Sequence, residues 1–207
     1  MKRSILFLCY ACLIGNVFAQ NKPKGNVQNN SYSQSRLTCA YFDKNTYYYE
    51  DIALQSVVSS ALNSLRNLPA DAYYDSSSQK ENVRQMLEAV HVKFTDSELS
   101  NLTQVKSIQI DSKLGIFEYA YFKCKFEQRG NSVYYRKTSG SQRQNGYLYR
   151  LDEKTIYFLG AWSVNDDPIK DYNSDQALIG ALYKLSSGIF IMVIPEGNDN
   201  YNILVFK

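Results

Sequence analysis

The spacing of apolar positions changes part-way along the chain, from a helical period to a period of two. Residues 51–68 carry apolar side chains at helical spacing, and Pro69 marks the end of this helix. A second helix is predicted after a capping box of Ser78 and Glu81. Thr95 and Glu98 repeat the capping pattern before a third, short helix. The first part of the domain is therefore predicted to be mainly helical.

Beyond Gln104, apolar and polar residues alternate in short runs separated by turn residues, which is typical of half-buried strands. The run 177–185 is ambiguous, because its leucines suit a helix while Gly180 and the following Ser-Ser-Gly suit a strand and a turn. We favour the strand. Eight strands are then predicted, over residues 105–111, 115–128, 131–138, 146–151, 155–162, 177–185, 189–195 and 201–207.

These elements predict an α+β fold in which helices come first and an antiparallel β-meander follows. The meander either stays open or curls into a barrel, since about eight strands with short connections suit both. We expect one globular domain over residues 37–207, with 37–104 mainly helical and 105–207 forming the meander. Residues 20–36 are polar and nearly free of apolar side chains, so they are expected to form a flexible leader.

The first 19 residues have the layout of a cleaved secretory signal peptide. Lys2 and Arg3 are followed by an apolar run from Ile5 to Ile14, and small residues lead up to Ala19. The run is shorter than the roughly 20 apolar residues that a membrane-spanning helix needs, and no later run reaches that length. The mature chain is thus expected to begin at residue 20, without a transmembrane segment, in the periplasm or outside the cell.

Loss of the signal peptide changes the charge and the cysteine content. The formal net charge falls from +3 to +1 when Lys2 and Arg3 leave, which gives no electrostatic argument for binding nucleic acid. Of four cysteines, Cys39 and Cys124 remain. They form either a disulfide or two unpaired thiols, and the even number in an exported protein favours the disulfide.

Three segments of the chain carry a family resemblance: YAYFKCKF, KTSGSQRQNGYLYRLDEKTIYFLG, and the closing pair of apolar strands with Pro195. They resemble an exported bacterial family with a domain of unknown function, the DUF4893 type. The family tends to carry a further Cys where this chain has Val105, so a disulfide within the sheet is excluded here. Because the family has no assigned activity, the resemblance implies an exported β-rich domain and no chemistry.

The segment SGSQR is the strongest candidate for a binding site. Glycines permit unusual backbone angles there, and nearby basic residues could present a patch to an anion. The alternative is a hairpin connection whose polar side chains bond their own backbone. The candidate binding residues are Arg136, Ser139, Ser141, Gln142, Arg143 and Arg150.

The sequence gives only weak indications of a catalytic or metal-binding site. His91 is the single histidine, so a multi-histidine metal site is excluded, and the cysteine spacing does not suit zinc. His91 could serve as a base for Ser139 or Ser141, although no nucleophile-elbow motif is present. Glu118 on a predicted strand is the other candidate, as part of a carboxylate pair. We predict no cofactor, no metal and no catalytic residue.

The sequence favours a non-enzymatic binding domain whose ligand is an anionic small molecule, a glycan or an envelope protein. The alternatives are a hydrolase of envelope or extracellular polymers, and an interaction or inhibitor protein. A binding domain is expected to show a pocket lined by Tyr and Arg without a perturbed carboxylate. A hydrolase is expected to bring Glu118 to a second carboxylate, or a loop serine to His91. Trp162 is expected in the core.

Overall fold

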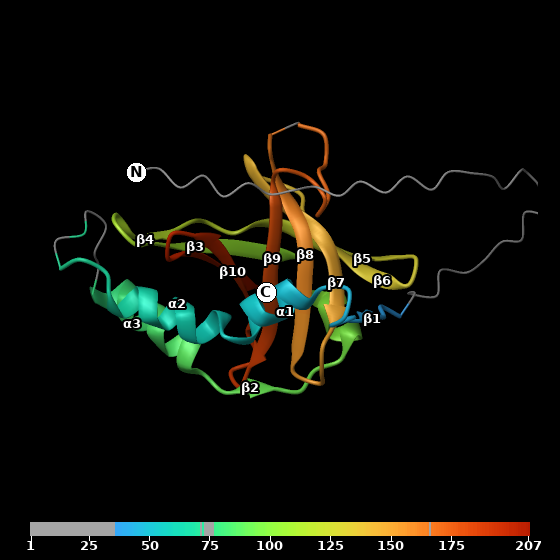
Figure 1. The fold of residues 1–207 in the computed structure, drawn as a ribbon, viewed down its shortest axis with the longest axis horizontal. Coiled ribbons are helices and arrows are strands. Elements are labelled where there is room, and N and C mark those ends of the chain that lie inside the picture. The colour runs from blue at the N-terminus through green and yellow to red at the C-terminus, as the bar shows by residue number, and fades with distance from the viewer. Residues whose placement is uncertain (1–35, 71, 73–76, 166) are drawn as a thin grey trace, which may run out of the picture. The chain divides into compact units, whose positions relative to one another are not determined.

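The computed structural model describes residues 36–207, except residues 71, 73–76 and 166 (Figure 1). The predicted signal peptide and leader, apart from Arg36, lie outside the described residues. The helices come first, as predicted. They are α1 (Tyr48–Gln55), α2 (Val57–Arg66), α3 (Ser77–Glu88) and the 3-10 helix η1 (Asp96–Asn101). The first predicted helix is divided in two at Ser56. Glu98 accepts a hydrogen bond from the Thr95 backbone at 2.8 Å, as the capping pattern predicts.

The remaining chain forms an antiparallel barrel of eight strands, each hydrogen-bonded to two neighbours. Around the barrel the order is β3-β5-β6-β7-β8-β9-β10-β11, and β11 pairs with β3 to close it. The fold class is therefore confirmed, in its barrel form. The strands are β3 (Gln104–Asp111), β5 (Phe122–Arg129), β6 (Ser132–Lys137), β7 (Gln142–Arg150), β8 (Thr155–Val164), β9 (Ala177–Leu185), β10 (Phe190–Gly197) and β11 (Asn200–Phe206).

Three short strands extend the barrel. They are β1 (Ala40–Tyr41) on β7, β2 (His91–Val92) on β9, and β4 (Gly115–Glu118) on β3. The long strand predicted over 115–128 is divided into β4 and β5, with the chain leaving the sheet at residues 119–121. The polar run 139–146 lies between two predicted strands and was expected to be a loop. In the structure most of it belongs to a strand, because β7 already begins at Gln142.

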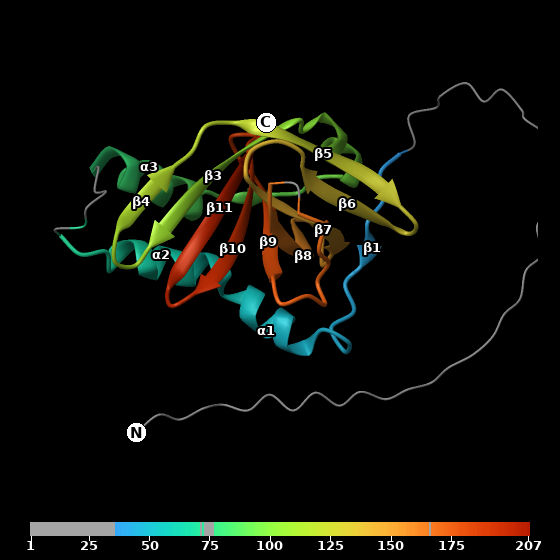
Figure 2. The same ribbon diagram turned by 90° about the horizontal axis from the view of Figure 1, so that it is seen from above.

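The barrel has an apolar layer on each side of its wall. Outside, the buried faces of α1, α2 and α3 pack against residues of β3, β8, β9, β10 and β11, such as Ile108, Ile191 and Ile203. Figures 1 and 2 show these helices along one side of the barrel. Inside, the alternate residues of the same strands form a second core.

One end of the barrel is closed by apolar side chains. Leu99 of η1 is fully buried there, together with Phe94 and the segment around Leu37. They pack against inward-facing residues such as Phe190 and Phe206. The interior of an eight-stranded barrel is either filled by side chains or holds one small ligand. Here the apolar inner core fills the end under η1, whereas polar side chains line a cavity at the opposite end.

Candidate functional site

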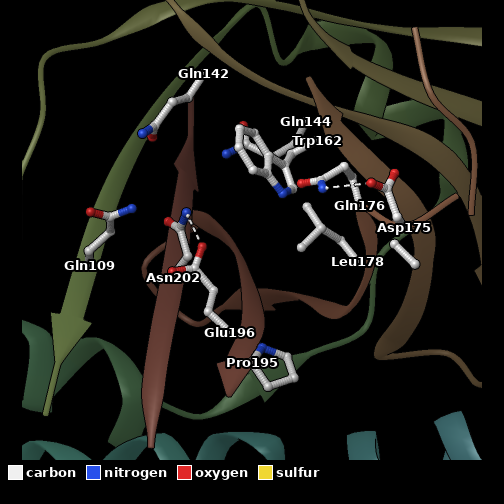
Figure 3. A pocket seen from close by; sticks show the side chains of 11 residues that line it. Gln109, Gln142, Gln144, Trp162, Asp175, Gln176, Leu178, Pro195, Glu196 and Asn202 are labelled. Atoms are coloured by element: carbon white, nitrogen blue, oxygen red, sulfur yellow. Dashed lines mark hydrogen bonds between the residues drawn. The ribbon is translucent and has the colours of Figure 1, made fainter. Parts of the chain in front are cut away.

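The end of the barrel opposite η1 holds a chamber with a cavity volume of about 420 Å³ (Figure 3). That volume lies within the ~300–1,000 Å³ of typical small-ligand sites. The wall is built from strands β3, β7, β8, β9, β10 and β11 and from the residues just before β9. The lining residues are Gln109, Gln142, Gln144, Trp162, Asp175, Gln176, Ala177, Leu178, Pro195, Glu196 and Asn202.

Strand alternation explains why these side chains face inward. Residues two apart on a strand share a face, and directly paired residues of adjacent strands share it too. Gln144 pairs with Trp162, two residues from Gly146 and Gly160, which pair with each other. On the other side, Gln109 pairs with Asn202. The chamber residues thus continue the inward-facing rows that form the apolar core farther down.

Glycines make room beneath the chamber. Gly146 and Gly160 lie so close that a Cβ on Gly146 would come within 2.4 Å of the Gly160 Cα. A Cβ on Gly160 would come within 2.2 Å of the Asn145 carbonyl oxygen and 2.4 Å of the Phe158 ring. The Phe158 ring therefore lies where other residues would place side chains. It separates the apolar inner core from the polar chamber.

A hydrogen-bonded chain fixes one wall of the chamber. Ser107 donates to the Asn202 side-chain oxygen, and Asn202 Nδ2 donates to Glu196 Oε1 at 3.1 Å. Asn202 is 2 % exposed and Ser107 is 7 % exposed. Because both ends of the Asn202 amide are bonded, the position of the Glu196 carboxylate is set by the buried interior.

Gln144 differs from Asn202 in having an unpartnered oxygen. Its side chain is 4 % exposed, and Oε1 is buried without a hydrogen-bond partner among the described residues. A buried acceptor without a donor is destabilising, and such atoms are few in folded proteins. In Figure 3, Gln144 lies beside Trp162 in the chamber. One of the residues that line the chamber therefore carries an acceptor without a donor among the described residues.

The charged groups of the chamber are carboxylates. Partial burial and the nearby Asp111 raise the pKa of Glu196, although the residue as a whole remains solvent-accessible at the rim. The pKa of Asp175 is lowered by hydrogen bonds from Gln176 and Lys170, and Lys170 Nζ lies 3.2 Å from its carboxylate. None of the described lining residues is Lys, Arg or His. The chamber therefore does not have the basic lining that an anion would require.

The candidate SGSQR segment meets the chamber through Gln142, which lines it. Ser139 and Ser141 lie in the tight turn between β6 and β7, where the Ser139 hydroxyl accepts from the Lys123 backbone at 2.8 Å. The Arg143 Nε donates to the Gly140 carbonyl at 3.1 Å, so this side chain helps to hold the turn. Arg136 lies on β6 opposite Lys125 of β5, and on its other side pairs with Asn145 of β7.

Arg150 does not lie with the other candidates, contrary to the expected basic patch. It is at the far end of β7, which is nine residues long, so about 26 Å of strand separates it from Gln142. It donates through Nε to Asp96 Oδ1 at 2.7 Å and stacks over the Phe94 ring at 4.8 Å. Sequence proximity on a strand does not bring its two ends together.

The structure does not bring the candidate catalytic residues together. His91 pairs with Leu185 of β9 at the closed end of the barrel, whereas Ser139 and Ser141 lie at the chamber end. Glu118 lies on β4 opposite Ile108, on the helix-covered outer face, and forms an ion pair with Lys106. An unbroken strand would place Glu118 on the same face as Cys124 and Phe126, but the break at residues 119–121 changes the register of β4.

The expected disulfide is absent, and Cys39 and Cys124 are separate buried thiols. The residue before Cys39, Thr38, bonds through its backbone to Gln128, four positions along β5 from Cys124. Burial raises the pKa of both thiols to about 12.

Sequence reasoning missed most of the chamber. Trp162 is at the rim with 36 % exposure rather than in the core, and Gln109, Gln144, Glu196 and Asn202 were not singled out. The lining also lacks the expected tyrosines and arginines. The sequence did contain one indication of the chamber: polar residues occupy inward-facing positions of strands with alternating apolar and polar residues, close to Gly146. Without the strand boundaries, these residues were indistinguishable from loop residues.

One known protein family matches most of the chain. The family model described as Domain of unknown function (DUF4893) matches residues 57–205. The chain belongs to this family. The match begins at α2, so the DUF4893 region includes α2, α3 and η1 and not just the segments after Val105 that carried the resemblance. No curated protein and no solved structure was found to match the chain.

The description of the DUF4893 family assigns it no activity. In the part of the DUF4893 chain that the structure describes, no helix has the length and apolar character needed to cross a membrane.

Proposed function

We propose that this protein is an exported, non-enzymatic domain that binds a small polar ligand in the chamber at the open end of its barrel. The unpartnered Gln144 Oε1 is the observation that carries the proposal, because it is a buried acceptor on a residue that lines the cavity. Pocket residues with fixed orientation and an unmet hydrogen bond are typical of ligand sites. Export rests on the first 19 residues, which have the signal-peptide pattern.

The construction of the barrel supports binding rather than a purely structural role. The inner core is packed with apolar side chains under η1, whereas the other end keeps a polar cavity. A barrel that served as a scaffold alone would be more stable with that end filled as well. The hydrolase alternative that relied on His91 or Glu118 has lost its geometric support, because both residues lie outside the chamber.

Trp162 provides a direct test, since it is the single tryptophan of the chain and lines the chamber. The protein is titrated with neutral sugars, with spermidine and with phosphate while Trp162 fluorescence and the melting temperature are recorded. We expect a saturable change in both with one of these classes. Gln144→Leu should weaken that response at least tenfold, because it removes the acceptor while keeping the side-chain volume.

The matched control is Gln85→Leu, a substitution of the same kind on the surface of α3. It should leave the response unchanged. If none of the three classes changes the fluorescence or the melting temperature, the binding function is contradicted.

A further inference from the structure

Most of the polar side chains of the chamber are primary amides: Gln109, Gln142, Gln144, Gln176 and Asn202. An amide offers a donor and an acceptor side by side, and a hydroxyl group also donates and accepts. Building on the proposed function, we propose that the ligand of the chamber is a neutral saccharide, held by these amides and by the indole ring of Trp162.

The buried end of the chamber needs a ligand that donates a hydrogen bond. Gln144 Oε1 lies beneath the rim and has no donor among the described residues. A sugar hydroxyl can donate to it and still accept from a neighbouring amide, so one group meets two needs. A ligand with acceptors alone, such as a fully ionised phosphate, would leave Gln144 Oε1 unsatisfied.

The aromatic surface of the chamber lies next to this acceptor. Trp162 pairs with Gln144 across β7 and β8, so the indole and the amide are on the same inner face. Leu178 and Pro195 add apolar surface, and Figure 3 shows Leu178 close to Trp162 and Gln176. A sugar ring has an apolar C–H face and a rim of hydroxyls. The pairing of one flat aromatic surface with surrounding amides matches that shape.

The charges of the chamber argue against ionic ligands. Glu196 and Asp175 are the charged lining residues, so an anion would meet carboxylates and no cation. A cationic amine would suit the carboxylates, but Asp175 is already paired with Lys170 at 3.2 Å. A cation would also leave the amide N–H donors of the glutamines without acceptors. Glu196, held by Asn202 at 3.1 Å, instead presents an acceptor to a hydroxyl.

The size of the cavity limits the saccharide to a short one. About 420 Å³ is near the lower end of the range for small-ligand sites. The chamber opens at the end of the barrel, beside Gln142 and the turn that precedes it. A longer chain could therefore enter by one terminal unit, with its remaining units outside the barrel.

The test is a titration of the full chain with glucose, galactose, N-acetylglucosamine, maltose and cellobiose, followed by Trp162 fluorescence. At least one sugar should give a saturable change. Calorimetry on Trp162→Ala should then show about tenfold weaker binding, the loss expected for one aromatic contact. Tyr147→Ala is the matched control, because Tyr147 is 37 % exposed, close to the 36 % of Trp162, but faces outward from β7. It should bind as the wild type does.

Gln144→Leu gives a second measurement that does not depend on Trp162, with a predicted loss of at least tenfold in sugar affinity. Saturation by spermidine or phosphate, with no response to any of the sugars, would overturn the saccharide inference and leave the binding function standing. Sugar binding that is equally strong in Gln144→Leu and Trp162→Ala would also overturn it, because the sugar would then bind elsewhere. No response to any class would remove both proposals.

Discussion

His91 is a half-buried imidazole whose surroundings oppose its protonation. Its ring stacks on Tyr183 with the centroids 4.0 Å apart, and Nε2 is buried without a partner among the described residues. Burial, with a smaller contribution from the nearby Lys154, lowers the pKa of His91 below its usual value. The imidazole is thus a neutral packing element of β2 on β9, not a base for the turn serines.

This environment predicts a loss of stability in mild acid. Below the usual histidine pKa of about 6.5, the unfolded chain takes up a proton that the folded chain does not, so the free energy of unfolding falls until the pH passes the folded pKa. In His91→Phe the ring stack is kept and the titration is removed. Urea unfolding at pH 7.5 and pH 5 should therefore show a smaller loss in the variant.

The single histidine makes a direct control possible, because one imidazole C–H resonance reports its titration in the folded protein. A midpoint at or above 6.5 would contradict the proposed environment. At the residue scale, the sequence showed correctly that His91 cannot belong to a histidine cluster. It could not show the contact with Tyr183, which depends on the pairing of β2 with β9.

Among the secondary-structure elements, η1 is attached to the barrel by an ion pair between Asp96 and Arg150, and the sequence had placed Arg150 among the candidate binding residues. Asp96 at the start of η1 accepts from Arg150 of β7 and, through Oδ2, from the Cys39 backbone at 2.7 Å. The two charged side chains are 13 % and 12 % exposed. Arg150 also donates to the Asp152 carbonyl at 2.8 Å. Three segments of chain are thus joined at the closed end of the barrel.

Removing one member of this pair should be costly, because it leaves the other charge nearly buried and unpaired. We expect Asp96→Ala to lower the free energy of unfolding by about 3 kcal/mol. Arg150→Met, which keeps most of the side-chain length, should also destabilise, and the double variant should lose less than the sum of the two. Urea unfolding of the four proteins measures this coupling.

The binding response of folded Arg150→Met at the chamber should match that of the wild type. Additive losses, or weakened binding in that variant, would show that Arg150 acts otherwise than as the partner of Asp96.

The start of β7 shows why the candidate site was only partly predictable. Alternation of apolar and polar residues located most strands, since one face of each is buried in an apolar layer. At Gln142 and Gln144 the inward face is polar, because it lines the chamber. The run Gln-Arg-Gln-Asn-Gly therefore had the composition of a loop. The feature that makes these residues a candidate site is the same feature that hid the strand.

In the whole molecule, the two ends of the barrel differ although the strands run through both. The helices-first order and the meander followed from local periodicity, but the closure of the barrel by β11 on β3 is a non-local pairing that no local pattern specifies. The wall of the open end, where Ser107 and Gln109 of β3 meet Asn202 of β11, exists because of that closure. Residue patterns thus predicted the elements, and the chamber arises from their assembly.

The short pairing of β3 with β5 predicts where the molecule opens first. β3 and β5 pair through Gln104–Lys123 and Val105–Phe122, and then separate where the chain leaves the sheet at residues 119–121. β8, by contrast, pairs along nearly its whole length with both β7 and β9. Local opening follows the regions with the fewest buried contacts and hydrogen bonds. Hydrogen exchange should therefore be faster for the amides of Phe122–Cys124 than for those of Phe158–Ala161. Native-state exchange followed by mass spectrometry measures this difference, and equal protection in the two segments would show that the barrel unfolds as one unit with no weaker seam.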